Sequence, residues 1–310
     1  MTIFFSLSPS HRARALPHAA SLPFSVAPTM ASYTETPFTT TLASTRELPG
    51  TLTSPAASSP AAATAASTST PCGFLLLLHG MASHQDHSFA PALARLLAQR
   101  LSLHVLRYTS RGPAPHPAEP AHRFRICGAS QEDCDDLAAV SAHAVASGLG
   151  PLRGLIGHSR GANTILYHAA AHSLSVPLVC LAPRHDLPGM LRSRIFSDAQ
   201  RDALAAGQPV VWPNKAGDIS VTPEDAALLH SLRDMSAPLA ALPPRAPLLL
   251  CHGTADATIP HADSQAMAAL RPANTQLLLL PGAPHNFAKG HEAPMAAAVG
   301  DFLAAQLGAA

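Results

Sequence analysis

Short apolar runs alternate with longer segments of helical period from residue 73 to the end of the chain. The runs hold few polar residues, which is typical of strands buried on both faces of a sheet. Their alternation with helical segments is typical of βα units. The pattern therefore predicts an α/β fold with a mostly parallel central sheet. Its predicted strands are 73–79, 103–108, 152–157, 177–182, 247–252 and 275–280.

Helical spacing marks the segments between these runs. In 88–101, five apolar side chains fall on one stripe of the predicted helix. Ser130 is placed to cap the next helix, which is expected to end near Gly148 and Gly150. The other predicted helices are 162–174, 262–270 and 292–307. Helices are therefore expected to flank the sheet.

The segment just before residue 73 has a weaker pattern. Two short strands are predicted at 38–42 and 47–53, around a turn at Pro49 and Gly50. Residues 55–71 are rich in Ala, Ser, Thr and Pro, and are interpreted as a low-complexity loop or linker. The hairpin would bring the expected number of strands to eight.

The span 183–245 interrupts the alternation between the sixth and seventh predicted strands. It is too long for an ordinary connection. Within it, Thr222 is followed by Pro223 and two acidic residues, which is the pattern of a helix N-terminus. We expect a small helical insert here, placed as a lid over a site.

The extreme N-terminus is predicted to be a disordered extension or an organelle transit peptide over 1–36. The first 70 residues hold only two acidic residues, while Arg12 and Arg14 lie near the start. A start at Met30 would remove the transit peptide. The α/β domain is then expected to span 37–310. The cytoplasm is the expected compartment, or a plastid or mitochondrion if 1–36 directs import.

Composition excludes several classes of function. The 20 Lys and Arg residues balance the 19 Asp and Glu residues, so no global charge favours nucleic acid or an anionic membrane. The apolar runs are far shorter than the roughly 18 residues of a membrane helix. The five cysteines show no repeated spacing, which argues against a disulfide framework or a zinc site. The oligomeric state stays open.

The first candidate for chemistry is the Gly-His-Ser-Arg-Gly sequence at 157–161, which matches G-x-S-x-G. The pattern alone is weak. Here, however, it lies between a predicted strand and a predicted helix, which is the context of a nucleophile elbow. Such a turn presents the hydroxyl at a helix N-terminus, where developing negative charge is stabilised. Ser159 is therefore predicted to be a nucleophile.

A serine nucleophile needs a base, and the base needs an acid to orient it. Two loops that follow the last two predicted strands supply these groups in the expected order, as Asp256 and then His285. We predict that His285 is the general base and that Asp256 is the orienting acid. Asp186, in the loop after the preceding strand, is the alternative to Asp256.

Acyl transfer also needs hydrogen-bond donors for an oxyanion. The backbone N–H groups of Met81, in the turn after the first strand of the regular region, and of Arg160, after the serine, are the predicted donors. Ala82 is the alternative to Met81.

Other polar and sulfur-containing residues are interpreted as structural. The spacing of His84, Asp86 and His87 matches no metal-ligand pattern, so these residues are expected to be loop residues. Cys180 and Cys251 lie within apolar strands and are expected in the core. Three further histidines lie at strand ends or in the elbow: His79, His158 and His252. No metal and no cofactor are expected.

In these motifs the chain resembles the α/β-hydrolase superfamily, and is similar to its cinnamoyl/feruloyl-esterase-like and serine-aminopeptidase-like members. The resemblance covers roughly 39–307. It has two departures: Met81 replaces an aromatic residue after His-Gly, and Thr109 replaces an Asp after Arg-Tyr. The motifs that carry it are 78–81, 107–112, 157–161, 252–260 and 282–285.

The resemblance implies a serine hydrolase that acts on a small-molecule carboxylic ester, or on a thioester or amide, through an acyl-enzyme on Ser159. Two other readings stay open. One is a binding protein of the same fold without catalysis, and the other is a cofactor-free, peroxidase-like enzyme. Both keep the same scaffold, so they differ from the first reading only in chemistry.

Overall fold

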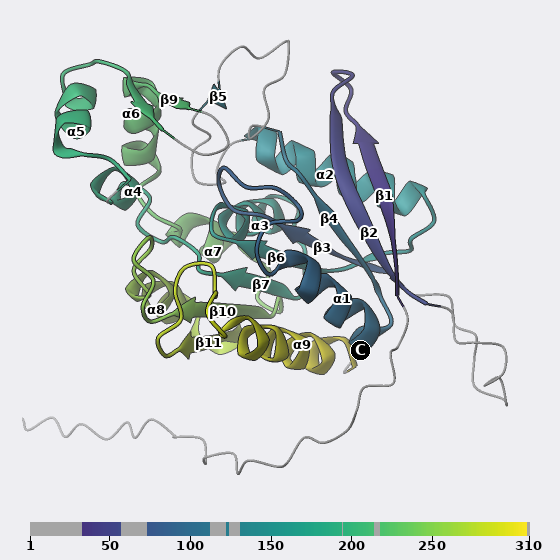
Figure 1. Cartoon of the computed structure of the whole chain (residues 1–310). Helices are drawn as coiled ribbons and strands as arrows, with labels where there is room; N and C mark the ends of the chain where they lie inside the picture. The colour runs from purple at the N-terminus through teal and green to yellow at the C-terminus, as the bar shows by residue number, and fades with distance from the viewer. Residues whose placement is uncertain are drawn as a thin grey trace, which may run out of the picture. The chain divides into compact units, whose positions relative to one another are not determined.

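A computed structural model of the chain describes residues 33–56, 73–111, 122–123, 131–193, 195–213 and 218–308 (Figure 1). Three predictions fall on residues outside these ranges. They are the extension up to residue 32, most of the low-complexity loop at 55–71, and the cap at Ser130.

The eight-stranded sheet has the order β1-β2-β4-β3-β6-β7-β10-β11. The pairs β1/β2 and β2/β4 are antiparallel, and the other neighbours are parallel. The mostly parallel sheet predicted from the apolar runs is therefore confirmed. Across the sheet the strands are β1 (Tyr33–Thr41), β2 (Glu47–Pro55), β4 (His104–Tyr108), β3 (Phe74–Leu78), β6 (Leu152–His158), β7 (Leu178–Leu181), β10 (Leu248–Gly253) and β11 (Thr275–Leu280).

Helices cover both faces of this sheet, which explains why inner strands such as β3 and β7 are apolar throughout. In β3, Leu75 and Leu77 point to one core cluster, while Leu76 and Leu78 point to the other. One cluster is covered by α1 (Ala90–Leu101) and α9 (Glu292–Gly308) (Figure 1). The other is covered by α2 (Gln131–Ala146), α3 (Arg160–Ala171), α7 (Ser236–Ala241) and α8 (Ala262–Leu270), and a 3₁₀ turn at Pro272–Asn274 follows α8.

The N-terminal hairpin corrects two predictions. Its turn lies at 42–46, where the Leu42 amide donates to the Arg46 carbonyl at 2.8 Å, and the predicted turn at Pro49 and Gly50 is wrong. Both residues lie inside β2. Gly50 is required there by close packing, because a Cβ would stand 2.7 Å from the Phe38 carbonyl oxygen. Strand β1 also begins at Tyr33, ahead of the domain start expected at residue 37.

The insert between β7 and β10 is only partly helical. It contains α4 (Gly189–Arg192), α5 (Asp198–Ala205), α6 (Pro223–Leu232) and α7, and also the strands β8 (Val210–Trp212) and β9 (Ile219–Val221). These two strands form a small sheet with β5 (His122–Arg123), in the order β5-β9-β8. The small helical insert predicted from the sequence therefore contains helices, and in addition two short strands that were not predicted. The N-terminus predicted for α6 is confirmed, since Thr222 and Asp225 form a reciprocal capping box.

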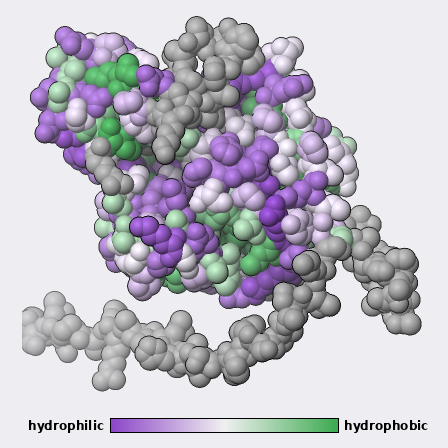
Figure 2. Space-filling model, in the orientation of Figure 1, coloured by the Kyte–Doolittle hydropathy of each residue, from purple (hydrophilic) through white to green (hydrophobic). Residues whose placement is uncertain are grey.

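The insert carries part of the exposed apolar surface of the described chain. Val211 and Leu228 are two of the exposed large apolar residues in the described chain, and Figure 2 shows hydrophobic residues gathered in this region. In the sheet region most large apolar side chains are buried. None of the helices in the described ranges combines the length and hydropathy needed to cross a bilayer. The insert's role as a lid stays a prediction.

Candidate active site

Ser159 lies at the sharp turn between β6 and α3. Its backbone has φ 53° and ψ −117°, a conformation that is strained for any residue with a Cβ. Its amide donates to the Leu181 carbonyl at 2.8 Å, which fixes the turn to β7. The turn is so tight that a Cβ on Gly157 would stand 2.3 Å from the Gly161 carbonyl oxygen. Only glycine fits there, and the hydroxyl of Ser159 stands at the start of α3.

The loops after β10 and β11 are joined to each other by hydrogen bonds. The Ala255 amide donates to the Ala283 carbonyl at 3.1 Å, and the Gly282 amide donates to the Thr254 hydroxyl at 2.9 Å. The two strands run parallel and end side by side. Asp256 and His285, which belong to these loops, are therefore held at the same edge of the sheet.

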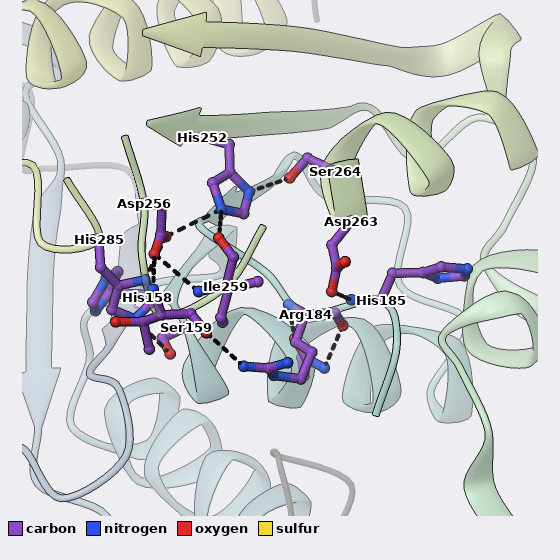
Figure 3. Close-up of polar contacts among 12 residues, drawn as sticks. His158, Ser159, Arg184, His185, His252, Asp256, Ile259, Asp263, Ser264 and His285 are labelled. Carbon is purple, nitrogen blue, oxygen red and sulfur yellow. Dashed lines mark hydrogen bonds and ion pairs between the residues drawn. The ribbon is translucent and has the colours of Figure 1, made fainter. Parts of the chain in front are cut away.

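The structure brings together the three side chains predicted to act on a substrate (Figure 3). The Ser159 hydroxyl lies 3.1 Å from His285 Nε2, and His285 Nδ1 lies 2.6 Å from an Asp256 carboxylate oxygen. A carboxylate only accepts hydrogen bonds, so the proton of the neutral ring is on Nδ1. Nε2 is then free to accept the proton of the serine hydroxyl.

Asp256 lies in a dense set of donors. Its side chain is 0% exposed, and one carboxylate oxygen accepts the Thr258 and Ile259 amides at 2.7 and 2.9 Å. Burial by itself raises the pKa of a carboxyl group, but hydrogen bonds from His252 and His285 and the charge of the His285 ring hold the pKa of Asp256 below its usual range. Asp256 is therefore ionised at neutral pH.

Asp186, the alternative acid, is used elsewhere. One of its oxygens accepts the Gly189 amide at 3.1 Å, and the other pairs with Arg192. In the described part of the chain it makes no hydrogen bond with His285. Of the two candidates, only Asp256 contacts the imidazole.

The backbone of His285 is itself held in place. His158 Nε2 donates to the His285 carbonyl at 3.0 Å, and the two rings pack at 4.9 Å between centroids. Phe89 packs edge-on against His158 at 5.3 Å. Burial, and then the charge of His285, lower the pKa of His158 to about 3. His158 is thus a neutral donor that orients the base, which fits the structural role expected of it.

The residues of the two predicted oxyanion donors, Met81 and Arg160, line the same pocket as Ser159. In the described residues neither backbone N–H donates a hydrogen bond. The turn before Met81 is fixed by His79, which donates from Nδ1 to the Gly80 carbonyl at 2.6 Å and accepts the Ser110 amide at Nε2. Ala82, the alternative donor, has a positive φ of 51°.

The side chain of Arg160 points away from the pocket. Its Nη1 lies 2.9 and 3.0 Å from the two carboxylate oxygens of Asp133, and its Nη2 donates to the Ser110 hydroxyl. The ion pair is buried on both sides. It fixes the first residue of α3, and with it the backbone N–H that follows Ser159. Sequence reasoning missed this contact.

Beside the serine lies a pocket that is partly open to solvent, and its space, with the open mouth included, is about 350 Å³. Its apolar wall comes partly from the insert, through Met190 and Ile195, and partly from Met81 and Ile259. The pocket thus adjoins both the candidate nucleophile and the candidate donors.

This site belongs to a known architecture. Residues 75–302 match the sequence profile described as the alpha/beta hydrolase family. The chain belongs to this family. The fold predicted from the sequence is therefore confirmed, with the insert as its main elaboration.

Solved structures of other members have the same fold. Est1E from Butyrivibrio proteoclasticus is 17% identical, with a TM-score of 0.66 over 88% of this chain and 99% of that protein. The esterase Pf2001 of Pyrococcus furiosus is 15% identical, with a TM-score of 0.61 over 91% and 96%. The monoacylglycerol lipase of Paleococcus ferrophilus is 17% identical, with a TM-score of 0.57 over 76% and 96%. A comparison with curated proteins finds no match.

Several residues that the sequence predicts to be structural lie in the core or contact other structural residues in this alpha/beta hydrolase. Asp86 pairs with the buried Arg107 at 3.0 Å, and the described residues contain no cluster of His, Cys, Asp and Glu that would hold a metal ion. Cys180 and Cys251 are buried and free. Thr109, the departure from the family pattern, accepts the Gln85 amide at 3.1 Å.

His252 has a further role that the sequence did not reveal. Its Nε2 contacts Asp256 at 3.2 Å and the Ile259 carbonyl at 3.1 Å, and its Nδ1 contacts the Ser264 hydroxyl at 2.7 Å (Figure 3). His252 therefore contacts the same carboxylate oxygen of Asp256 as His285 does, and helps to hold the acid in place. Its position four residues before Asp256, at the end of β10, is the signal that sequence reasoning passed over.

Proposed function

We propose that this alpha/beta hydrolase is a serine hydrolase that cleaves carboxylic esters through an acyl-enzyme on Ser159. The hydrogen-bonded chain from Ser159 through His285 to Asp256, beside an apolar pocket, carries the proposal. Its neighbours in structure, described as esterases and a lipase, agree with it.

The chemistry follows from these positions. His285 Nε2 takes the hydroxyl proton as Ser159 attacks the acyl carbonyl, and Asp256 stabilises the imidazolium that forms. The negative charge on the carbonyl oxygen is met by the amides of Met81 and Arg160, and by the N-terminus of α3. His285 then protonates the leaving alcohol. Water, deprotonated by the same ring, releases the acyl group and restores the enzyme.

A fluorophosphonate probe tests the nucleophile directly. We expect the wild-type protein to be labelled and the Ser159→Ala protein not to be labelled. With 4-nitrophenyl butyrate, kcat is expected to fall by about 10⁴ to 10⁶ in this variant. Methyl ferulate is a useful second substrate, because Est1E has been described with ferulic acid bound.

Folded wild-type protein that is neither labelled nor active on any ester would favour the binding-protein reading. Halogenation that depends on peroxide, with no ester turnover, would favour the peroxidase-like reading. A circular dichroism spectrum that matches the wild type serves as the folding control for the Ser159→Ala protein.

A further inference from the structure

Arg184 is held rigidly next to the candidate nucleophile. It follows β7, and its backbone is fixed to α3 by both groups of the Asn163 side-chain amide. The Arg184 amide donates to Asn163 Oδ1 at 3.1 Å, and Asn163 Nδ2 donates to the Arg184 carbonyl at 2.9 Å. Asn163 lies one turn after Ser159, so Arg184 is positioned by the same helix end as the serine.

The guanidinium of Arg184 is buried without a carboxylate partner in the described chain. The residue is 6% exposed, and its one hydrogen bond from the side chain runs from Nη2 to the Thr258 carbonyl at 2.9 Å. Arg107 and Arg160 are buried to a similar degree, and each has an ion pair with Asp or Glu. Because a buried charge is costly unless it is paired, Arg184, in contrast to these two, needs a partner.

The acids around Arg184 already have other partners. Asp186 pairs with Arg192 and accepts the Gly189 amide. Asp263 accepts the His185 amide at 2.8 Å and the Asp186 amide at 3.3 Å. Neither carboxylate comes within ion-pair distance of Arg184. The guanidinium therefore keeps unused N–H donors.

Arg184 and Ser159 line the same pocket, and Figure 3 shows the guanidinium extending toward the serine. The other arginine on this pocket, Arg160, directs its side chain to Asp133. Arg184 is thus the source of positive charge among the described side chains that face the pocket. The remaining wall is largely apolar, which strengthens an ionic contact there.

The pocket lies on the acyl side of the scissile bond. A leaving alcohol must stay within reach of His285 Nε2, which protonates it. His285 is not among the residues that line the pocket, whereas Ser159 and both oxyanion donors are. A group that fills the pocket therefore belongs to the acyl part of the ester.

We infer that the preferred substrate carries a carboxylate on its acyl chain, and that Arg184 binds this carboxylate through a charge-assisted, two-pronged contact. The substrate class is then the half-esters of small dicarboxylic acids. This inference rests on the proposed ester hydrolysis and specifies its substrate. A guanidinium presents its donors in the planar geometry that a carboxylate matches.

A matched pair of substrates tests the inference at pH 7.5. The pair is mono-4-nitrophenyl adipate and its methyl ester, which share the leaving group and the acyl chain length but differ by one charge. We expect kcat/KM of the wild type to favour the acid by about 10- to 100-fold, the range of a charge-assisted hydrogen bond. A second pair, 4-(carboxymethyl)phenyl butyrate and its methyl ester, places the charge on the leaving group and is expected to show no such preference.

Arg184→Met is expected to reduce the acid-to-ester ratio of kcat/KM by most of that factor, and Arg184→Lys by less. Arg192→Met removes a nearby, more exposed arginine, and its ratio is expected to stay within about twofold of the wild type. An equal loss on both adipates would assign Arg184 to fixing the Thr258 loop and would overturn the inference. So would a wild-type ratio near one, or a preference seen only in the second pair.

Labelling by fluorophosphonate is run on every variant. Labelled protein without a preference for the acid refutes the carboxylate site and leaves ester hydrolysis standing. Protein that folds but is neither labelled nor active refutes the proposed function itself. If Arg184→Met does not fold, the ratio measured with Arg184→Lys decides.

Discussion

Replacing Ser159 by glycine is expected to leave a more stable protein than replacing it by alanine. The two variants lose the same hydroxyl and the same hydrogen bond to His285. They differ in the Cβ, which is what makes φ 53° and ψ −117° unfavourable. The comparison therefore isolates the backbone strain at the elbow from the loss of the hydroxyl.

The size of the effect follows from opposing terms. A residue with a Cβ in such a region costs about 1–3 kcal/mol, and glycine removes this cost. Glycine also makes the unfolded chain more flexible, which offsets about 0.4–1 kcal/mol. The net gain of Ser159→Gly over Ser159→Ala is therefore about 1 kcal/mol. In a chain of 310 residues it corresponds to a Tm difference of about 1.5 °C.

Differential scanning calorimetry of both variants measures this difference, with Ser231 as the control site. Ser231 is exposed in α6. Helical backbone favours alanine over glycine, so the order of stability of the two variants is expected to be reversed at this site. There Ser231→Ala is expected to be more stable than Ser231→Gly by about 0.8–1 kcal/mol. If Ser159→Gly proves equal to Ser159→Ala or less stable, the elbow stores no strain and the reasoning fails.

Three further outcomes follow from the same contacts. Asp256→Asn is expected to lower kcat on 4-nitrophenyl butyrate by about 10⁴, while Asp186→Asn is expected to leave kcat within about tenfold of the wild-type value. A larger loss of kcat in Asp186→Asn than in Asp256→Asn would identify Asp186 as the acid instead. Asp133→Asn leaves a buried guanidinium unpaired and is expected to cost about 3–5 kcal/mol in urea unfolding, whereas the exposed Asp135→Asn on the same helix costs little. Acid should destabilise the protein through His158, because burial and His285 lower its pKa from 6.5 to about 3. Above pH 6.5 the His158 ring is neutral in both the folded and the unfolded protein. Below pH 6.5 only the unfolded protein binds the proton. The free energy of unfolding therefore falls by on the order of 1.4 kcal/mol for each pH unit of acidification. Tm measured from pH 7 to 5 should therefore fall more steeply for the wild type than for His158→Gln, and equal slopes would contradict this.

The inner strands of the sheet were predictable because they are buried on both faces. A run such as 74–78 has no polar side, so the apolar residues mark the strand almost to its ends. The small strands of the insert were not predicted, because they are too short to show a pattern. Val210–Trp212 and Ile219–Val221 span three residues each, and three residues show neither a run nor an alternation.

Gly50 shows a second limit of the sequence. A Pro-Gly pair usually marks a turn, and the sequence contains no sign that backbone from two neighbouring strands closes in on this residue. The packing that requires glycine at this position comes from β1 and β4, whose pairing with β2 is set by the whole sheet. Local composition therefore gave a turn where tertiary packing placed a strand.

The candidate site likewise contains residues that the sequence predicts and residues that it does not. Ser159, Asp256 and His285 were predictable because each lies in a loop that directly follows a strand, and parallel strands bring such loops to one edge. The residues that orient them were not. Asp133 and Arg184 act through contacts between segments far apart along the chain, and the sequence shows only that polar residues occur there. His252 lies only four residues before Asp256, but a polar residue at a strand end does not by itself indicate a contact with the acid.

Those supporting contacts converge on the first turn of α3. Ser159 precedes the helix, Arg160 anchors its first residue through Asp133, and Asn163 fixes Arg184 one turn later. The nucleophile, one oxyanion donor and the charge in the acyl pocket are thus held by one rigid element. The base and its acid are held separately, by the joined loops of β10 and β11. In the described chain, only the Ser159–His285 and His158–His285 contacts directly link the groups held by α3 and its preceding turn to the groups held by the β10 and β11 loops. A change that loosens α3 should therefore disturb both the attack by Ser159 and the recognition of the acyl group. The same change should leave the His285–Asp256 pair intact.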